Sequence, residues 1–159
     1  MKGDDQVIQL LNETLKNELT AINQYWLHYR MLDNWGVQKL AEYERHESID
    51  EMKHADRLAD RILFLDGLPN FQALGRLRVG ENVEEILKAD MEAELQGAAL
   101  YREVVAHAET VRDYVTRDLA REILADEEKH IDFLETQFEM IARMGLENYV
   151  QLHSEAAAA

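Results

Sequence analysis

The chain has 159 residues, enough for one domain with a substantial hydrophobic core but too few for two. It contains no cysteine, which excludes disulfides, thiolate catalysis and cysteine-ligated zinc or iron–sulfur centres, and leaves oxygen and imidazole as the available metal ligands. The 32 acidic and 17 basic residues give a formal net charge of -15, which argues against a nucleic-acid or anionic-membrane partner and favours the attraction of cations.

The sequence also lacks the segments that direct a chain to a membrane. It has no stretch of about 18 apolar residues, and its first residues lack a basic segment followed by an apolar one. We therefore expect neither a membrane span nor a signal peptide, and we expect a cytoplasmic protein.

Apolar residues recur at helical spacing almost throughout the chain, so the predicted fold class is all-α. The first predicted helix covers residues 5–34 and ends before Gly36, which suits a left-handed cap. The second covers residues 37–65, and acidic residues interrupt its apolar stripe near the middle. The single proline and several glycines then mark residues 66–81 as a long connection.

That connection is long enough to run along the whole bundle. About 15 extended residues span about 50 Å, whereas a helix of about 28 residues is roughly 42 Å long. The third predicted helix covers residues 82–112, with Asn82 and Glu85 as a capping box. The fourth covers residues 114–144 after Asp113, and residues 146–153 should form a short fifth helix. The sequence thus predicts one domain over residues 1–159, a four-helix bundle with a long crossover between the second and third helices.

One pattern of carboxylate and histidine residues occurs twice, with a constant offset of 76 positions (18 to 94, for example). A lone Glu-x-x-His should occur about once by chance in a chain of this composition, but chance does not supply several further positions at the same offset. The repeated residues are Glu18, Tyr25, Asp50, Glu51 and His54 in the first half and Glu94, Tyr101, Asp126, Glu127 and His130 in the second.

A Glu from each of two helices, with a Glu-x-x-His from each of two others, is the ligand set of a di-iron or di-manganese site inside a four-helix bundle. At about 1.5 Å per residue from the turns, all six ligand positions lie at one level near the middle of the bundle. Four carboxylates buried there would repel one another, and two divalent cations would neutralise them. Oxygen donors with one imidazole per ion suit iron or manganese.

Within this site we expect different roles for the carboxylates and the tyrosines. Glu51 and Glu127 should bridge the two ions, and the remaining ligands should bind one ion each. Tyr25 and Tyr101 share a helix face with Glu18 and Glu94, where a phenol can donate to a ligand carboxylate. An ordinary core aromatic is the alternative for either tyrosine.

Several segments closely resemble bacterioferritin, and the resemblance covers essentially the whole chain. The segments that carry it are Asn17-Glu18-Leu19, Asn23-Gln24-Tyr25, His46-Glu47-Ser48-Ile49-Asp50-Glu51-Met52-Lys53-His54-Ala55-Asp56 and Asp126-Glu127-Glu128-Lys129-His130-Ile131-Asp132. The resemblance implies a ferritin-like bundle that oxidises Fe(II) with oxygen or peroxide at a ferroxidase centre of two iron ions per subunit. It also implies storage of ferric mineral in a hollow shell of twenty-four subunits built from two-fold dimers. Every ferroxidase ligand position is filled, by Glu18, Glu51, His54, Glu94, Glu127 and His130.

The resemblance implies a second cofactor, haem b, shared between two subunits with Met52 as an axial ligand. On its helix Met52 points about 100° away from Glu51, off the bundle core. A gap-filling methionine at a dimer contact is the alternative. Arg45 stands near this pocket, where we expect an aromatic residue. The pocket would be lined by four residues expected on the outer side of the first helix, which are Leu19, Ile22, Asn23 and Trp26.

Other candidates are weaker. His46 and Asp50 are candidates for an additional iron site on the cavity wall, with solvated polar residues as the alternative. No role is assigned to His28, His107 or His153. The resemblance places Asn148 and Gln151 at a four-fold channel and implies a ferredoxin as electron donor for iron release. Candidate pore residues for iron uptake are Asn34, Asp66, Asp132 and Glu139.

Competing functions remain open from the sequence. Rubrerythrin shares the duplicated ligands but needs cysteines that are absent here, and a ribonucleotide-reductase-like radical protein needs a longer chain. Another di-iron oxidase or peroxidase of the ferritin-like superfamily fits the same ligands. A helical interaction module would leave the acidic stripes in solvent.

Overall fold

The computed structural model describes residues 1–155, and over this range the chain forms helices and connections without strands. The helices are α1 (Asp5–Asn34), α2 (Gln38–Phe64), α3 (Val83–Thr110), α4 (Tyr114–Met144) and α5 (Leu146–Leu152). Residues 156–159, which the predicted domain includes, lie outside the described part, so the extent of that domain stays a prediction. Among the described helices, none combines the length and the apolarity that crossing a membrane requires.

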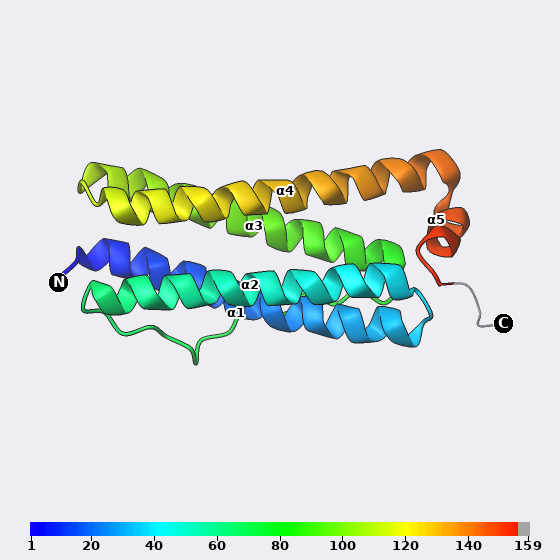
Figure 1. Ribbon diagram of the computed structural model, residues 1–159, viewed down its shortest axis with the longest axis horizontal. Coiled ribbons are helices and arrows are strands. Elements are labelled where there is room, and N and C mark those ends of the chain that lie inside the picture. The colour runs from blue at the N-terminus through cyan, green and yellow to red at the C-terminus, as the bar shows by residue number, and fades with distance from the viewer. Residues whose placement is uncertain (156–159) are drawn as a thin grey trace.

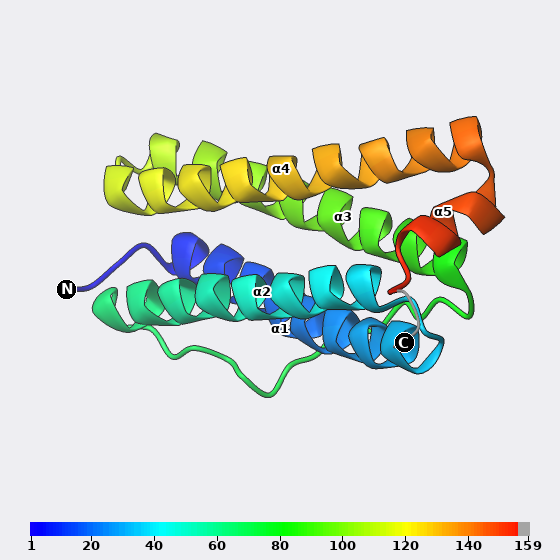
Figure 2. The same ribbon diagram turned by 45° about the vertical axis from the view of Figure 1, so that its right-hand side comes forward.

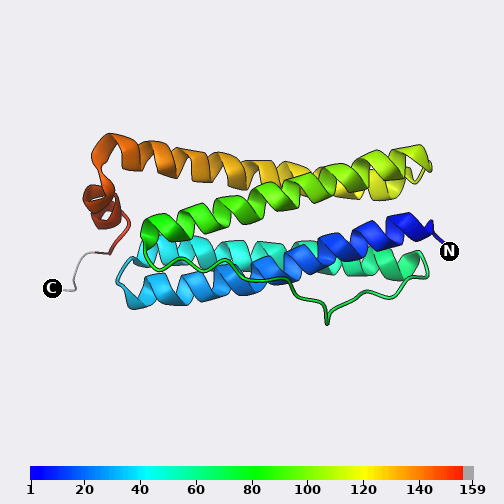
Figure 3. The same cartoon turned by 180° about the vertical axis from the view of Figure 1, so that it is seen from behind.

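The four long helices lie side by side, and α5 packs across one end of the bundle (Figures 1 and 2). The segment between α2 and α3 runs back along the outside of α1, so α3 begins at the end of the bundle where α2 also begins (Figure 3). Helices α2 and α3 therefore run in the same direction. The predicted all-α bundle with a long crossover and a short fifth helix is confirmed.

The crossover follows α1 because its peptide N–H groups bond to one row of α1 side chains. Successive donors along the segment bond to acceptors spaced four or eight residues apart, which places the acceptors on one helix face. The donor and acceptor pairs are Asn70 with Asn12, Gly75 with Thr20, Arg78 with Gln24, and Gly80 with His28. Position 80 accepts only glycine, because a Cβ atom there would lie 2.3 Å from the backbone nitrogen of Ile86.

Helix ends follow local chemistry. The carboxylate of Asp113 accepts from the N–H of Thr116 at 3.1 Å and begins α4, as predicted. Asn82 caps α3 by accepting from Glu85 N–H at 2.9 Å, but the Glu85 carboxylate accepts from the N–H of Glu81, so only half of the predicted capping box forms. The third helix ends at Thr110, two residues before its predicted end, because the following turn needs a positive φ of 60° at Arg112.

The hydrophobic core is divided into two clusters by a polar layer. One cluster lies toward the N-terminal end of α1 and includes Leu11, Leu15, Leu58, Ile62 and Ile123. The other lies toward α5 and includes Leu32, Leu40, Ile86, Leu87, Leu134 and Tyr149. Each fully buried aliphatic side chain contributes roughly 1.5–3 kcal/mol, so the two clusters can hold the bundle together around a costly polar centre.

Candidate metal centre

Six predicted ligand residues meet in the polar layer between the two hydrophobic clusters. Each long helix contributes at least one of them: Glu18 from α1, Glu51 and His54 from α2, Glu94 from α3, and Glu127 and His130 from α4. The carboxylates are almost fully buried. Together with Glu47, which the sequence did not predict as a ligand, the six residues form two groups whose ligand atoms lie within 4.8 Å of one another. The groups are Glu18, Glu51, His54 and Glu127 in one and Glu47, Glu51, Glu94 and His130 in the other. Each group could hold a metal ion.

Glu51 belongs to both groups because its two oxygens face different histidines. Its Oε2 lies 3.5 Å from His54 Nδ1, and its Oε1 lies 3.5 Å from His130 Nδ1. Glu127 lies 3.5 Å from His54 Nδ1 and also interacts with Glu94 of the other group. This geometry suits the bridging positions expected of Glu51 and Glu127.

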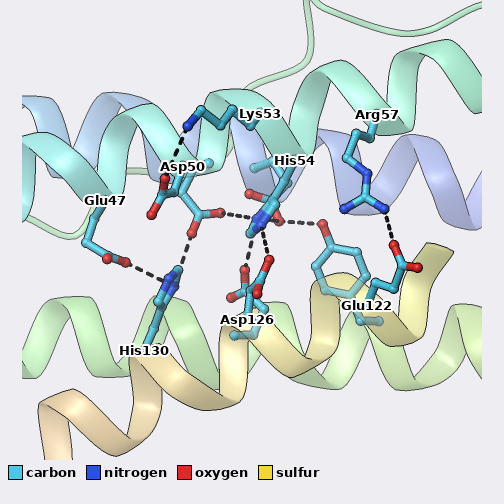
Figure 4. A network of polar contacts seen from close by, with 12 residues as sticks. Glu47, Asp50, Lys53, His54, Arg57, Glu122, Asp126 and His130 are labelled. Atoms are coloured by element: carbon cyan, nitrogen blue, oxygen red, sulfur yellow. Dashed lines mark hydrogen bonds and ion pairs between the residues drawn. The ribbon is translucent and has the colours of Figure 1, made fainter. Parts of the chain in front are cut away.

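Both imidazoles present Nδ1 to the carboxylates. His54 Nε2 faces the other way, toward Asp126 Oδ2 at 3.1 Å (Figure 4). If this Nε2 carries the proton and donates it to Asp126, Nδ1 is left with a free lone pair. A carboxylate behind a histidine is the arrangement that fixes the ring of a metal ligand. Asp126, noted from the sequence only as the repeat of Asp50, therefore orients His54.

Several of the buried ligand groups hold protons where cations are absent. Burial, followed by repulsion from neighbouring carboxylates, raises the pKa of Glu51 and of Glu127 well above the usual range. Burial opposes the charged form of His54, but the nearby carboxylates of Glu127, Glu18 and Glu51 outweigh it and raise its pKa. Burial also opposes ionisation of Glu18, yet the neighbouring Glu51 and His54 side chains lower its pKa.

The atoms without hydrogen-bond partners are the ones a metal would use. Among buried side chains, unpartnered atoms include one oxygen from each of the four ligand carboxylates and both inward-facing ring nitrogens: Glu18 Oε2, Glu51 Oε1, Glu94 Oε2, Glu127 Oε1, His54 Nδ1 and His130 Nδ1. Buried polar atoms are rarely left unpaired. Hard oxygen and imidazole donors converging in this way fit two divalent ions such as Fe(II) or Mn(II).

The two repeated tyrosines donate to ligand carboxylates, but across the bundle. Tyr25 of α1 donates its hydroxyl to Glu94 of α3, and Tyr101 of α3 donates to Glu18 of α1. Burial, followed by nearby carboxylates, raises the pKa of both phenols, so they remain donors. The predicted role is present, although each tyrosine serves the glutamate of the other helix.

Comparisons with known proteins identify the family of this chain. A sequence family described as Ferritin-like domain matches residues 8–144. The bacterioferritin of Brucella melitensis biotype 1 is 51% identical over 99% of this chain and 98% of its own length. The chain belongs to the bacterioferritin family. Two other bacterioferritins, from Mycobacterium avium and Rhodobacter capsulatus, are 49% and 46% identical over 94% and 97% of this chain, and over 94% and 96% of their own lengths.

This member of the bacterioferritin family has a second buried polar cluster that sequence reasoning missed. His28, Glu44 and Asp90 are all fully buried. Since His28 Nε2 accepts from Gly80 N–H at 3.0 Å, the ring proton must sit on Nδ1, which donates to Asp90 at 2.9 Å. Both oxygens of Glu44 lack hydrogen-bond partners, and burial, followed by the charge of Asp90, raises its pKa. Glu44 therefore keeps its proton in the metal-free fold.

The signal for that cluster was present but indirect. His28 and Asp90 lie one helical turn from Tyr25 and Glu94, on faces already expected to point inward. No residue near His28 in the sequence has the spacing of a second ligand, because the partners of His28 come from α3 and the crossover. The other unassigned histidines make structural contacts: His107 pairs with Asp4 at 2.9 Å, and His153 stacks on Tyr149.

The candidates for the haem pocket lie in different environments. The side chain of Met52 is 51% exposed, as expected for a residue directed off the core. Trp26 and Asn23 are exposed and Ile22 is half-buried. The expectation that Leu19 faces outward is wrong, because this residue is buried in the hydrophobic cluster around Leu15.

A cavity of about 580 Å³ adjoins the centre between α2 and α4. It is lined by Glu47, Asp50, Lys53, His54, Arg57, Asp126, Lys129 and His130. Figure 4 shows Glu47 and His130 on one side of this region and His54 with Asp126 on the other. The two candidates for a cavity-wall iron site have separate partners, since His46 pairs with Glu42 at 3.4 Å and Asp50 with Lys53 at 3.9 Å.

The channel and pore candidates lie on the surface. Asn148 and Gln151 line a shared cavity of about 650 Å³ beside α5. The four pore candidates are all exposed, and they are distributed over the end of α1, the end of α2 and the length of α4: Asn34, Asp66, Asp132 and Glu139. Their roles as channel and pore residues stay predictions.

Proposed function

We propose that this chain oxidises Fe(II) to Fe(III) at a dinuclear centre and stores the ferric product as mineral in a hollow shell of twenty-four copies. Membership of the bacterioferritin family supports the iron-storage part. The ferroxidase part is supported chiefly by the convergence of unpartnered buried ligand atoms from four helices. The residues proposed to carry the reaction are Glu18, Glu51, His54, Glu94, Glu127 and His130.

In this proposal two carboxylates bridge the iron ions and two bind a single ion each. Glu51 offers one oxygen toward each imidazole and would bridge the two iron ions, together with Glu127. Glu18 with His54, and Glu94 with His130, would each bind one ion. The hydroxyls of Tyr25 and Tyr101 hold the terminal carboxylates at fixed angles, which lowers the cost of assembling the site.

The iron ions supply the redox chemistry, in which each Fe(II) gives one electron to oxygen or peroxide. The protein must exchange protons with these substrates. Without metal, Glu51, Glu127 and the two imidazoles hold protons, and they release them as cations bind because only the deprotonated groups are ligands. Released protons can leave through His54 Nε2 and Asp126, which lie at the wall of the adjoining cavity.

Further parts of the proposal rest on the family resemblance. Met52 would ligate a haem b shared by two copies, and its exposed thioether is compatible with a ligand at an interface. A ferredoxin would supply electrons for iron release, and the location would be cytoplasmic. His46 and Asp50 would bind iron on the cavity wall only if both leave their present partners.

Metal-free protein, reloaded with Fe(II) in air, tests the function. We expect a particle of about twenty-four chains by analytical ultracentrifugation, rapid oxidation seen by stopped-flow absorbance, and iron that stays with the particle during gel filtration. Iron oxidation without a shell would instead favour another di-iron oxidase or peroxidase of the ferritin-like superfamily. A shell that neither oxidises nor retains iron would refute the proposal.

The ligand assignment has its own test. Glu18→Ala and Glu94→Ala should each abolish the rapid phase of oxidation while the shell still assembles, because removing one carboxylate from a metal-free cluster relieves repulsion. Glu13→Ala and Glu103→Ala are matched controls, being exposed residues on the same two helices. Wild-type initial rates in both ligand variants would show that the dinuclear assignment is wrong.

A further inference from the structure

Glu47 lies in the centre but has no counterpart in the duplicated pattern. The position 76 residues later is Ile123, an apolar residue fully buried in a hydrophobic cluster. The repeat therefore predicts two equal metal positions, one beside each histidine. Glu47 adds a carboxylate on the His130 side that the repeat does not supply.

The side chain of Glu47 points toward His130. It lies on α2 one turn before Glu51 and is 5% exposed. Its Oε2 lies 2.9 Å from His130 Nδ1, closer to that atom than Glu94 Oε1 at 3.3 Å or Glu51 Oε1 at 3.5 Å. Figure 4 shows the two side chains extended toward each other from facing helices.

This contact changes when a cation binds at His130. Nδ1 is then a metal ligand and no longer available to pair with Glu47, whose Oε2 is buried and has no hydrogen-bond partner. A buried carboxylate left unpaired costs several kcal/mol, whereas one that binds the cation is neutralised. Because Glu47 already lies within 4.8 Å of the ligand atoms of Glu51, Glu94 and His130, it can reach the same ion.

We propose that Glu47 is a further ligand of the metal ion on the His130 side, so that the two positions of the dinuclear centre are unequal. The inference rests on the proposed function, since it assumes that ions occupy the centre. Glu47 also lines the adjoining cavity, as His130 does. The His130-side ion thus has a ligand at the boundary of that cavity in addition to those inside the bundle.

Metal binding distinguishes this ligand without reference to activity. Zn(II) titrated into metal-free assembled protein by calorimetry should fill two positions per chain in the wild type. In Glu47→Gln, which preserves shape and removes the charge, one of the two steps should weaken by about tenfold to a hundredfold, and the other should stay within about twofold. Glu42→Gln, an exposed residue on the same helix, is the control.

Anomalous diffraction from Zn(II)-soaked crystals identifies which position changes. The Glu47→Gln crystals should lose occupancy on the His130 side and keep it on the His54 side. Unchanged binding in both steps, equal weakening of both, or loss on the His54 side would each overturn the inference. Failure of the proposed function is distinguishable, because the wild-type protein itself would then not bind two ions.

Discussion

At the scale of single residues, the position of the Glu127 carboxylate depends on the absence of a side chain at Gly97. A Cβ atom there would lie 3.1 Å from Glu127 Oε2 and 3.1 Å from Asn17 Nδ2, closer than ordinary contact. Glycine is otherwise unfavourable in the middle of a helix, by about 1 kcal/mol relative to alanine. Its presence in α3 is explained by the space that the Glu127 carboxylate needs.

Gly97→Ala should therefore weaken metal binding without lowering the stability of the metal-free protein. We expect the metal-free protein to keep its stability or gain up to about 1 kcal/mol from helix propensity, partly offset by the close contact. Displacement of Glu127 should lower the affinity for metal and slow Fe(II) oxidation severalfold. Thermal unfolding and calorimetric titration measure the two effects, and unchanged metal affinity would contradict this role of Gly97.

Met52→Leu tests the proposed haem ligand. The substitution conserves side-chain volume and removes only the thioether, so assembly and Fe(II) oxidation should be retained. The purified shell should lack the Soret band. Stoichiometric haem with unchanged ligation in this variant would rule Met52 out.

At the scale of elements, the second polar cluster connects three helices and the crossover. His28 of α1 joins Asp90 of α3 to the backbone of Gly80, and Gln24 joins Asp90 to the backbone of Arg78. Glu44 of α2 completes the cluster. Because Asp90 already accepts from two donors, Glu44 must stay protonated to avoid a second buried charge beside it.

Glu44→Gln should stabilise the metal-free protein at high pH. The folded protein raises the pKa of Glu44 above the ordinary 4.5, so its contribution to stability is full below 4.5 and is lost as the pH rises toward the raised value. Glutamine is neutral at every pH and has nearly the same shape. We expect chemical denaturation to show a gain of roughly 1–3 kcal/mol at pH 8 and little difference at pH 4.5. Equal stability of the two proteins at pH 8 would contradict a neutral Glu44, and Glu42→Gln is the exposed control.

Without metal, the ligand residues of the centre should make the protein less stable as the pH rises. Glu51, Glu127, His54 and His130 all have raised pKa values in the metal-free fold, so their contribution decreases as the pH rises. Glu18 has the opposite shift, but near neutral pH it is ionised in both states and adds no slope.

We therefore expect the melting temperature of metal-free protein to fall between pH 6 and pH 8. Excess Mn(II) should raise the melting temperature more at pH 8 than at pH 6, because binding requires deprotonated ligands. Calorimetry at a series of pH values measures both trends. A metal-free protein that becomes more stable toward pH 8 would contradict the proton-holding centre.

At the scale of the whole molecule, the charge of -15 per chain should speed iron uptake into an assembled shell. The field is screened over about 10 Å at 0.1 M salt, so the rate of Fe(II) oxidation should fall as ionic strength rises. Asp132→Asn with Glu139→Gln should reduce this salt dependence if acidic pores guide the iron. Stopped-flow measurements across a salt series compare the native and variant proteins. An oxidation rate that changes neither with salt nor with the substitutions would mean that iron enters by another route.

The sequence by itself determined the helices, the crossover and the level of the six ligands. Apolar periodicity predicts each helix because it is a property of residues close in the chain. The 76-residue repeat predicts a common level because the rise per residue of an α-helix is constant, so equal distances from two turns become equal heights. Burial of Glu18 and Glu94 follows instead from their positions within the apolar stripes of their helices.

Only the tertiary structure decided which side chains meet across the bundle. Sequence offsets measure position along a helix, but contacts between α1 and α3 also depend on how each helix is rotated and which neighbour it faces. For this reason the exchange of tyrosine partners, the partners of His28 and the space at Gly97 had no clear signal in the sequence. The sequence did not indicate the role of Glu47 for the same reason. Only the packing of the two halves brings His130 Nδ1 within 2.9 Å of Glu47 Oε2.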